Sequence, residues 1–515
     1  MVNVNDEAQA ERELAHAVAT GQADTIARVA MANLWPLYTN HSEALTSAVS
    51  LLPSTVLKRY PALRVVHPLT VVLAQTTRPF KPLVSPDEAR SMHPDELDLV
   101  TLAQMVAFRF SGDVSAALIY AQRLEDRVAQ IKHESRERID GPLWYYHFSI
   151  GSTRLAAGDS SRALLEFATS RQLGAFSKQP YGEKLALGRI ALAHAVRGSL
   201  TNAELALAEA AELVVPSAAH RAGSLSTEQT AAALVAVERM APDAERLLGT
   251  LEPYNSTQLT WPFVLLAHTR WLLAQHRPTE ALELALLTRD AHPPQHGSVA
   301  SDIINAASID ALWGVDDVAT ARRLADSHTK PGPLTLFAIA RLALNESRID
   351  TAAQSLRRLE AAGNLGPVHG ITLQLFTMWL ELLRSGSIDS ATAQRLARIA
   401  ITTDSRRLYA GMPRQLVETV AAQLQVDEAD EFVAALGGLT FLDVEPRPKL
   451  TKSETRVLHA ILVHPTTATI ATSLHLSPNT IKSHLKSLYR KLGCATRAEA
   501  ITIAARFHLI PRESD

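Results

Sequence analysis

The pattern of apolar and polar positions from Ala10 to about Leu436 is helical almost throughout. This stretch is rich in alanine and leucine and low in aromatic residues. No part of it sustains the period-two alternation that is typical of a half-buried strand. The pattern therefore predicts an all-α fold for this part of the chain.

The helical pattern also repeats. A short turn, followed by an alanine two to five residues later, recurs at a spacing of roughly 33 to 46 residues, the period of solenoids built from helix pairs. The small residue after each turn allows the second helix to approach the first closely. We therefore predict a TPR-like (tetratricopeptide-like) helical repeat solenoid over residues 106–440, with a helical bundle without regular stacking as the alternative. The turns begin at Gly112, Gly158, Gly198, Ala241, Arg277, Gly314, Ser347 and Gly386.

Prolines mark the regions before and after the predicted repeats. We expect residues 1–105 to form an irregular N-terminal helical region, because prolines interrupt the helical pattern there. Pro446 and Pro448 favour a semi-rigid linker over residues 441–449, which leads to a C-terminal domain at residues 450–515. The N-terminal prolines are Pro53, Pro61, Pro68, Pro79, Pro82, Pro86 and Pro94.

The C-terminal domain contains one helix with two very different faces, from Ser477 to Gly493. Ser477 can accept a hydrogen bond from a free first-turn amide, and Pro478 suits the first helical position. Gly493 suits the left-handed position just after the helix. An apolar stripe is formed by Ile481, Leu485, Leu488 and Leu492, and the opposite face carries Asn479, Lys482, Ser483, Lys486 and Arg490.

Three more helices accompany this one. Residues 467–474 form a short helix, which a tight turn connects to Ser477, and two short helices joined in this way have helix-turn-helix geometry. A T-x-x-E capping box opens the helix before this pair, and a second box opens the helix after it. The boxes are Thr451 with Glu454 and Thr496 with Glu499. We therefore expect a four-helix C-terminal domain.

The charge of the chain is unevenly distributed. The net charge is −2, but from Arg447 onward there are eleven Lys and Arg against four Asp and Glu, which gives about +7. The preceding residues carry about −9. Nucleic-acid affinity requires local positive charge, and here that charge coincides with the helix-turn-helix pattern.

Five ordered motifs of this domain together resemble the DNA-binding domain of LuxR-type (NarL/FixJ-like) transcription regulators. The chain departs from the family pattern at Lys452–Ser453, where Pro-Arg is usual, at His464, where a glycine is usual, and at Thr469, where an acidic residue is usual. The motifs are L-T-x-x-E-x-x-V-L at 450–458, I-A at 470–471, S-x-x-T-I-K-x-H at 477–484, K-L-G at 491–493 and R-A-E-A at 497–500.

The resemblance implies a role for the exposed face of the basic helix. It implies base contacts from Lys482, Ser483 and Lys486, and phosphate contacts from Asn479 and Thr480. Arg490 extends the same cationic face, so we expect it to contact DNA as well. A helix with such a face suits the major groove of double-stranded DNA. The alternative is an ordinary amphipathic surface helix.

The helical region also resembles the sensor region of MalT-type regulators within the LuxR group. Those proteins carry an ATP-binding domain before the repeats, whereas this chain contains no G-x-x-x-x-G-K-[ST] motif to hold a nucleotide phosphate. We therefore expect no cofactor, and we expect the input signal to act through the helices themselves.

A small-molecule effector could bind on the concave surface of such a solenoid. Among the aromatic residues we select Tyr145, Tyr146 and Trp261 as the candidate effector pocket, with packing between helices as the alternative. His292 and His296 flank a proline loop, where we expect solvent exposure rather than a metal site.

The final helix suggests a homodimer. Ala500, Ile501 and Ala504 can face the core of the domain, whereas Ile503, Phe507 and Ile510 fall on another side that a monomer would leave exposed. Relatives pair through this helix, and paired copies would read a two-fold repeated DNA site.

Other classes of protein are disfavoured. The composition, 47% apolar and 20% charged, is that of a soluble globular chain without a membrane span or secretion signal, so we expect a cytoplasmic protein. The single cysteine, Cys494, excludes an internal disulfide. No catalytic motif is present, and we do not expect an enzyme.

The sequence thus predicts a DNA-binding transcription regulator that responds to a small-molecule effector, with RNA polymerase as a possible further partner. A TPR-like protein-interaction adaptor in a signalling complex is the alternative.

Overall fold

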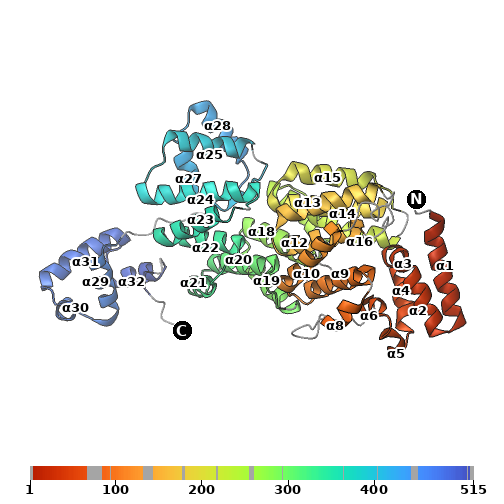
Figure 1. Ribbon diagram of the computed structural model, residues 1–515. Helices are drawn as coiled ribbons and strands as arrows, with labels where there is room; N and C mark the ends of the chain where they lie inside the picture. Colours follow the sequence, from red (N-terminus) through yellow and green to blue (C-terminus); the bar gives the residue numbers. More distant parts are fainter. Residues whose placement is uncertain are drawn as a thin grey trace.

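A computed structural model of the chain describes residues 4–66, 84–92, 94–130, 143–176, 180–215, 218–253, 260–292, 294–363, 365–402, 404–441, 450–506 and 509–510. Within these ranges the regular structure is helical and no β-strand occurs (Figure 1). The all-α prediction is confirmed. None of the described helices is both long and apolar enough to span a membrane.

The N-terminal helices after the first are short. The second helix, of 10 residues, is the longest of them, and the shortest has 4. Prolines stand at or just before several helix starts, where the missing amide hydrogen leaves no bond unmade. Pro68, Pro79 and Pro82 lie outside the described residues. The helices are α1 (Val4–Thr20), α2 (Ala23–Ala32), α3 (Leu34–Asn40), α4 (Ser42–Ser50), α5 (Ser54–Leu57), α6 (Pro61–Val66) and α8 (Pro86–Ser91).

Helix pairs then follow one another along the chain, from orange through yellow and green to cyan in Figure 1. From α14 to α24 the first helix of each pair packs against the first helix of the next pair as well as against its own partner. The pairs are α9 (Pro94–Phe110) with α10 (Val114–Gln130), α12 (Leu143–Ala156) with α13 (Ser160–Phe176), α14 (Pro180–Arg197) with α15 (Leu200–Glu212), α16 (Ala218–Arg239) with α17 (Ala244–Leu248), α18 (Trp261–Ala274) with α19 (Pro278–Ala291), α20 (Val299–Gly314) with α21 (Val318–Ser327), α22 (Pro333–Asn345) with α23 (Ile349–Ala361), and α24 (Pro367–Ser385) with α25 (Ser390–Thr402).

One predicted domain boundary falls inside a helix of the structure. A division between residues 105 and 106 would cut α9, which begins at Pro94. The boundary was predicted from the prolines that interrupt the helical pattern, but the last of these, Pro94, begins the long helix α9. The predicted linker falls largely on residues 442–449, which lie outside the described residues.

A left-handed residue stands within two positions of the start of every predicted turn. In the second of these turns, the amide of Asp159 donates to the carbonyl of Arg154 at 2.9 Å, which is the bond that ends a helix in a Schellman motif. Only four of the eight residues are glycine, which explains why half of the turns have a weak sequence signal. The left-handed residues are Gly112, Gly158, Gly198, Met240, His276, Asp316, Ser347 and Gly386.

An alanine without exposed surface follows each of these turns. It lies where the second helix crosses the first, and a larger side chain would push the two helices apart. After Gly314 and Gly386 the buried alanine is two residues later than the pattern suggested, because Ala319 and Ala391 are exposed. The buried alanines are Ala117, Ala163, Ala203, Ala244, Ala281, Ala321, Ala352 and Ala393.

The row of pairs curves so that its C-terminal end packs against its middle. Helix α24 contacts α14, and the short helix α26 (Arg407–Ala410) contacts α16 and α18. The contact is polar at its centre, since Glu238 of α16 accepts hydrogen bonds from Arg270 of α18 and Arg407 of α26, each at 2.8 Å. Helices α27 (Arg414–Ala421) and α28 (Val426–Ala435) complete this part of the chain.

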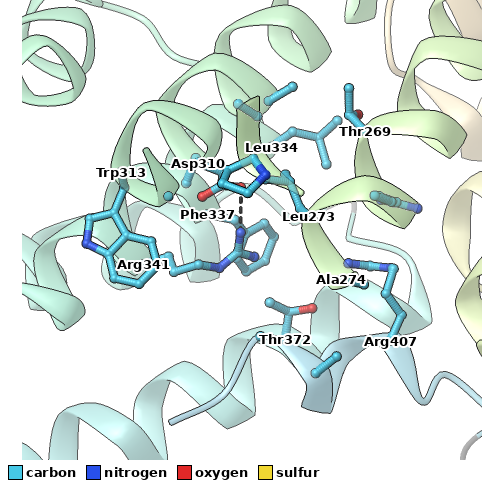
Figure 2. Close-up of a pocket in the computed structure, with 18 of the residues that line it drawn as sticks. Thr269, Leu273, Ala274, Asp310, Trp313, Leu334, Phe337, Arg341, Thr372 and Arg407 are labelled. Carbon is cyan, nitrogen blue, oxygen red and sulfur yellow. Dashed lines mark hydrogen bonds and ion pairs between the residues drawn. The ribbon is translucent and has the colours of Figure 1, made fainter. Parts of the chain in front are cut away.

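The curved row borders a cavity of about 640 Å³ (Figure 2). The first helices of three successive pairs supply much of its wall, and α24 and α26 supply the rest. Representative residues, one from each of α18, α20, α22, α24 and α26, are Leu273, Trp313, Phe337, Thr372 and Arg407.

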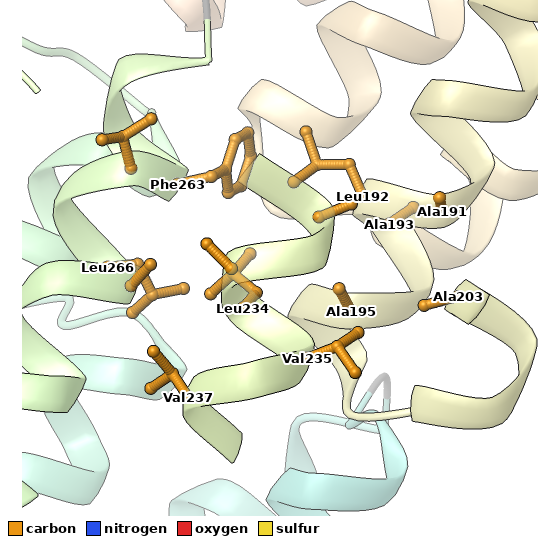
Figure 3. Close-up of a cluster of buried hydrophobic side chains, with 14 of the residues drawn as sticks. Ala191, Leu192, Ala193, Ala195, Ala203, Leu234, Val235, Val237, Phe263 and Leu266 are labelled. Atoms are coloured by element: carbon orange, nitrogen blue, oxygen red, sulfur yellow. The ribbon is translucent and has the colours of Figure 1, made fainter. Parts of the chain in front are cut away.

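Small and branched apolar side chains pack the neighbouring helices together. Figure 3 shows alanines of α14 beside leucines and valines of α16, with α18 on the other side. All of these side chains are buried in one continuous core. The residues labelled there include Ala195 of α14, Leu234 and Val237 of α16, and Phe263 and Leu266 of α18.

The aromatic residues predicted to line an effector pocket are packing residues instead. Tyr146 is 2% exposed, and Trp261 is 6% exposed with its ring stacked on His292 at a centroid distance of 3.9 Å. Tyr145 is half-buried against the N-terminal core. Among the described residues that line the 640 Å³ cavity, none of these three occurs. Helical periodicity marks an apolar face but does not say whether that face meets a neighbouring helix or a cavity, so this prediction was wrong.

Two glycines with the same backbone conformation test the closure of the row. Gly198 has φ +78° and Gly386 has φ +77°, so an alanine at either position is strained by about 1 kcal/mol. At Gly198 an added Cβ would also lie 2.4 Å from Cβ of Val368 in α24, whereas at Gly386 nothing lies within 4 Å. We expect Gly198→Ala to lower the free energy of unfolding by about 1–3 kcal/mol more than Gly386→Ala, measured by urea unfolding. Equal losses would show that the contact between Gly198 and α24 is not close.

Candidate DNA-binding site

Four helices form the C-terminal domain around their own core. The helix-turn-helix pair has the predicted limits, and apolar residues of all four helices are buried together. The helices are α29 (Lys452–Val463), α30 (Thr467–Leu474), α31 (Pro478–Leu492) and α32 (Arg497–Arg506).

Side-chain caps fix the start of each helix. Thr451 and Glu454 form a reciprocal capping box on α29, and both bonds of the predicted box between Thr496 and Glu499 are also present. Ser477 accepts a hydrogen bond from the amide of Thr480 at 3.1 Å, with Pro478 at the first helical position. These local predictions are confirmed.

A tight turn sets the angle between α30 and α31. His475 is left-handed, with φ 56°, and the amide of Leu476 donates to the carbonyl of Ala471 at 3.0 Å. Arg497 of α32 donates to the carbonyls of Pro465 and Ile461 and so ties the last helix to the segment before the pair. The pair is therefore held from both sides.

Helix α31 presents its polar face to solvent. Its apolar stripe is buried at Ile481, Leu488 and Leu492, with Leu485 half-buried. Thr480 is half-buried beside the cap. The exposed residues on the other side are Asn479, Lys482, Ser483, Lys486 and Arg490. In the described part of the chain none of the three cations among them forms an ion pair, so their charges are available to a ligand.

A buried carboxylate, which sequence reasoning did not identify, positions α31. Glu454 is 3% exposed and accepts hydrogen bonds from Ser487 Oγ at 2.8 Å and Lys491 Nζ at 2.7 Å. Burial alone raises the pKa of Glu454, but the bonds from Lys491, Thr451 and Ser487 lower it to about 2. The capping box gave a reason for an acidic residue here, but it gave no sign of the contacts across to α31.

The arrangement is that of a domain that places one helix against a duplex. Residues 448–504 match the family model described as bacterial regulatory proteins, luxR family. The C-terminal domain is a LuxR-type helix-turn-helix domain.

Two curated relatives of this LuxR-type domain are each described as probable transcriptional regulatory protein NarL, from two strains of Mycobacterium tuberculosis. Each is 38% identical over 63 residues, which is 12% of this chain. The chain spans only 29% of the length of these relatives. The similarity therefore concerns the DNA-binding domain and does not extend to the helical repeats.

The structure explains two departures from the LuxR pattern. Thr469 stands where an acidic residue is usual, and its Oγ1 accepts a hydrogen bond from the amide of Thr466 at 3.2 Å, so it completes a capping box on α30. His464 stands where a glycine is usual, but its backbone is extended, with φ −106° and ψ 122°, which any residue adopts. Neither change therefore disturbs the LuxR-type domain.

The predicted dimer surface needs correction. Ile510 is 6% exposed and belongs to the core of its own domain, so it is not on a face that a monomer leaves exposed. Ile503 is half-buried against the same core. Phe507 lies outside the described residues. The helical pattern was extended beyond α32, which ends at Arg506.

The described residues contain no group of three or more His, Cys, Asp or Glu side chains that could hold a metal ion. His292, expected on an exposed loop, is instead 8% exposed, with Nδ1 2.9 Å from the carbonyl of Thr288. Cys494 is half-buried beside α31, and burial raises the pKa of its thiol.

Removal of the charge on Glu454 should loosen the LuxR-type domain. We expect Glu454→Gln to lower the stability of the contact between α29 and α31 by about 2–3 kcal/mol, because Lys491 loses its anionic partner. The matched control is Glu499→Gln, which removes a capping carboxylate that is exposed and should cost less than about 1 kcal/mol. Hydrogen exchange of α29 and α31 in the full-length protein measures both.

The same pair predicts a pH dependence. Because the pKa of Glu454 is lowered to about 2, its stabilising effect is fully present above the ordinary glutamate pKa and is lost as the pH falls toward 2. The difference between wild type and Glu454→Gln should therefore shrink between about pH 4.5 and pH 2. A difference that stays constant over this range would contradict the charged contact.

Proposed function

We propose that the protein is a sequence-specific DNA-binding transcription regulator in which α31 enters the major groove. The observation that carries this proposal is the exposed face of α31, on which Lys482, Lys486 and Arg490 have no acidic partner among the described residues. The match of residues 448–504 to the luxR family supports it. The local charge of about +7 supports it independently.

The residues of α31 divide into two roles in this proposal. Lys482, Ser483 and Lys486 lie on the exposed face and contact base edges, which specify the sequence. Asn479 and Thr480 lie at the start of the helix, where the positive end of the helix dipole also favours a phosphate. Arg490, near the end of the helix, contacts the backbone or an adjacent base. Two copies of the chain would read a two-fold repeated site.

The helical repeats provide the input in this proposal. An effector that binds in the cavity would change how the DNA-binding domain is presented, and the regulator would then act on transcription through contact with RNA polymerase or by blocking it. What supports this part is the cavity of about 640 Å³, within the size range of small-molecule sites.

Genome-wide footprinting with the full-length protein tests the DNA-binding proposal. At fixed salt we expect discrete protected sites that are lost with Lys482→Ala. At one such site, Lys482→Ala and Lys486→Ala should each weaken binding by about 10- to 100-fold, since a good base contact contributes about 1–3 kcal/mol. Fluorescence anisotropy with a labelled duplex measures the affinity.

Lys58→Ala is the matched control, because Lys58 is an exposed lysine in the N-terminal region. This variant should bind DNA as tightly as wild type. Unchanged affinity in Lys482→Ala and Lys486→Ala would show that α31 is not the recognition helix. Absence of any salt-dependent duplex binding would favour the adaptor function instead.

A further inference from the structure

Both charged and apolar side chains line the cavity inside the curved row of helix pairs (Figure 2). Arg407 of α26 and Trp313 of α20 lie on opposite sides of it in this view, with Phe337 and Arg341 of α22 between them. Charged side chains are expensive to enclose, so each needs a reason to be there. The charges around the cavity therefore indicate what it holds.

Glu238 is the centre of an unequal charge cluster. Its carboxylate is fully buried, and its Oε1 accepts the hydrogen bonds from both Arg270 Nη1 and Arg407 Nε. Burial alone raises the pKa of Glu238, but Arg407 and Arg270 hold it below its ordinary value. Burial lowers the pKa of Arg270 to about 10, which still leaves it charged at neutral pH. Two guanidinium charges thus share a single carboxylate charge.

The other charged groups around the cavity do not compensate for this excess. Asp310 accepts a hydrogen bond from Arg341 and also feels the charge of Arg407, so that three guanidinium groups share the carboxyl groups of Glu238 and Asp310. Glu346 accepts two bonds from Arg322 Nε and is already matched. Asp316 lies on the exposed turn after α20. One positive charge therefore remains in excess where Arg270 and Arg407 border the cavity.

Several polar atoms of the wall also lack partners. Among the described residues, neither Nδ2 nor Oδ1 of Asn345 forms a hydrogen bond, and the same is true of Arg341 Nε and His369 Nε2. Burial lowers the pKa of His369 to about 3, so its ring is neutral and stacks on Phe337 at a centroid distance of 5.7 Å. Water can satisfy such atoms, but water cannot supply the missing negative charge.

The remainder of the wall is apolar and large enough for an organic molecule. Leu273, Trp313, Phe337 and Met412 border a volume of about 640 Å³. A volume of this size accommodates a drug-sized molecule, and aromatic rings favour a flat or aliphatic body between them. An inorganic anion alone would leave most of this surface unoccupied.

We propose that this cavity binds a small organic monocarboxylate, with its carboxylate at Arg270 and Arg407 and its apolar body against Trp313 and Phe337. This inference rests on the proposed function, because it names the class of effector that the regulator detects. A carboxylate carries one negative charge and matches the excess, whereas a phosphate monoester carries about 1.5 to 2 and would leave the site overcompensated.

Two hydrogen bonds connect the cavity to the segment that leads to the DNA-binding domain. His276, which borders the cavity, has Nε2 3.2 Å from the carbonyl of Thr440. Arg406, next to Arg407 in sequence, donates to the carbonyl of Gly437. A ligand that draws Arg407 toward the cavity therefore acts on residues 437–440, immediately before the predicted linker.

Calorimetric titration of the full-length protein without DNA tests the proposal. The probes are benzoate, 4-phenylbutyrate and octanoate, each beside its primary amide, and phenyl phosphate. We expect at least one acid to bind about 10- to 100-fold more tightly than its amide, because a charge-assisted contact with a guanidinium is lost in the amide. We also expect that acid to bind more tightly than phenyl phosphate.

Three variants separate this site from a general effect of charge. Arg407→Met should weaken binding of the acid by about tenfold or more and leave the amide unchanged. Arg407→Lys, which keeps the charge but not the forked guanidinium group, should retain more of the affinity for the acid than Arg407→Met. Arg323→Met, on the exposed face of α21, is the control and should change neither.

If Arg407→Met does not fold, Arg407→Gln, which keeps a polar side chain without the charge, replaces it in the test. Equal affinity for acids and amides, or no binding of any acid, would overturn the proposal. Because DNA is absent, these results are independent of whether α31 recognises a duplex. Footprints that persist without carboxylate binding would leave the DNA-binding function intact and reject the ligand class alone.

Discussion

A buried carboxylate lies at the centre of the contact that closes the curved row of helix pairs. Glu238 joins α16 to α18 and, across 169 residues of sequence, to α26. Helix pairs by themselves pack only against their neighbours, so a row of them has no inherent end point. The ion pairs at Glu238 stop the row at a defined curvature. The close approach of Gly198 to α24 is the apolar part of the same closing contact. Because breaking a buried pair is strongly unfavourable, this contact fixes the curvature on which the cavity depends.

The closing contact also lies between the cavity, where the effector is proposed to bind, and the segment that leads to the DNA-binding domain. Arg407 borders the cavity, and its neighbour Arg406 holds the segment near Gly437 that precedes the DNA-binding domain. The LuxR-type domain has a buried carboxylate of its own, Glu454, which orients α31 from within that domain. Orientation of α31 within its domain is therefore a local property, whereas in the proposed function its presentation to DNA depends on the distant closure.

Local features of the structure could be predicted from the sequence. The helix-turn-helix limits, the capping residues and all the repeat turns follow from residue preferences within a few positions, such as a left-handed glycine at Gly158 followed by the buried Ala163. The cavity could not be predicted, because its charged residues come from helices that meet only when the row closes. Trp261 and Ile510 were misassigned for a related reason. Periodicity marks an apolar face, but the packing partner of that face is set by the tertiary structure.

The central claim is that the cavity and the DNA-binding domain are energetically coupled. The most direct measurement is the affinity of the full-length protein for a footprinted duplex with and without its best-binding carboxylate, together with the affinity for that carboxylate with and without the duplex. Linkage requires the two factors to be equal, and allosteric coupling of about 1–3 kcal/mol would make them roughly 5- to 150-fold. Equal factors in this range would agree with the account, and factors of one in both directions would contradict it.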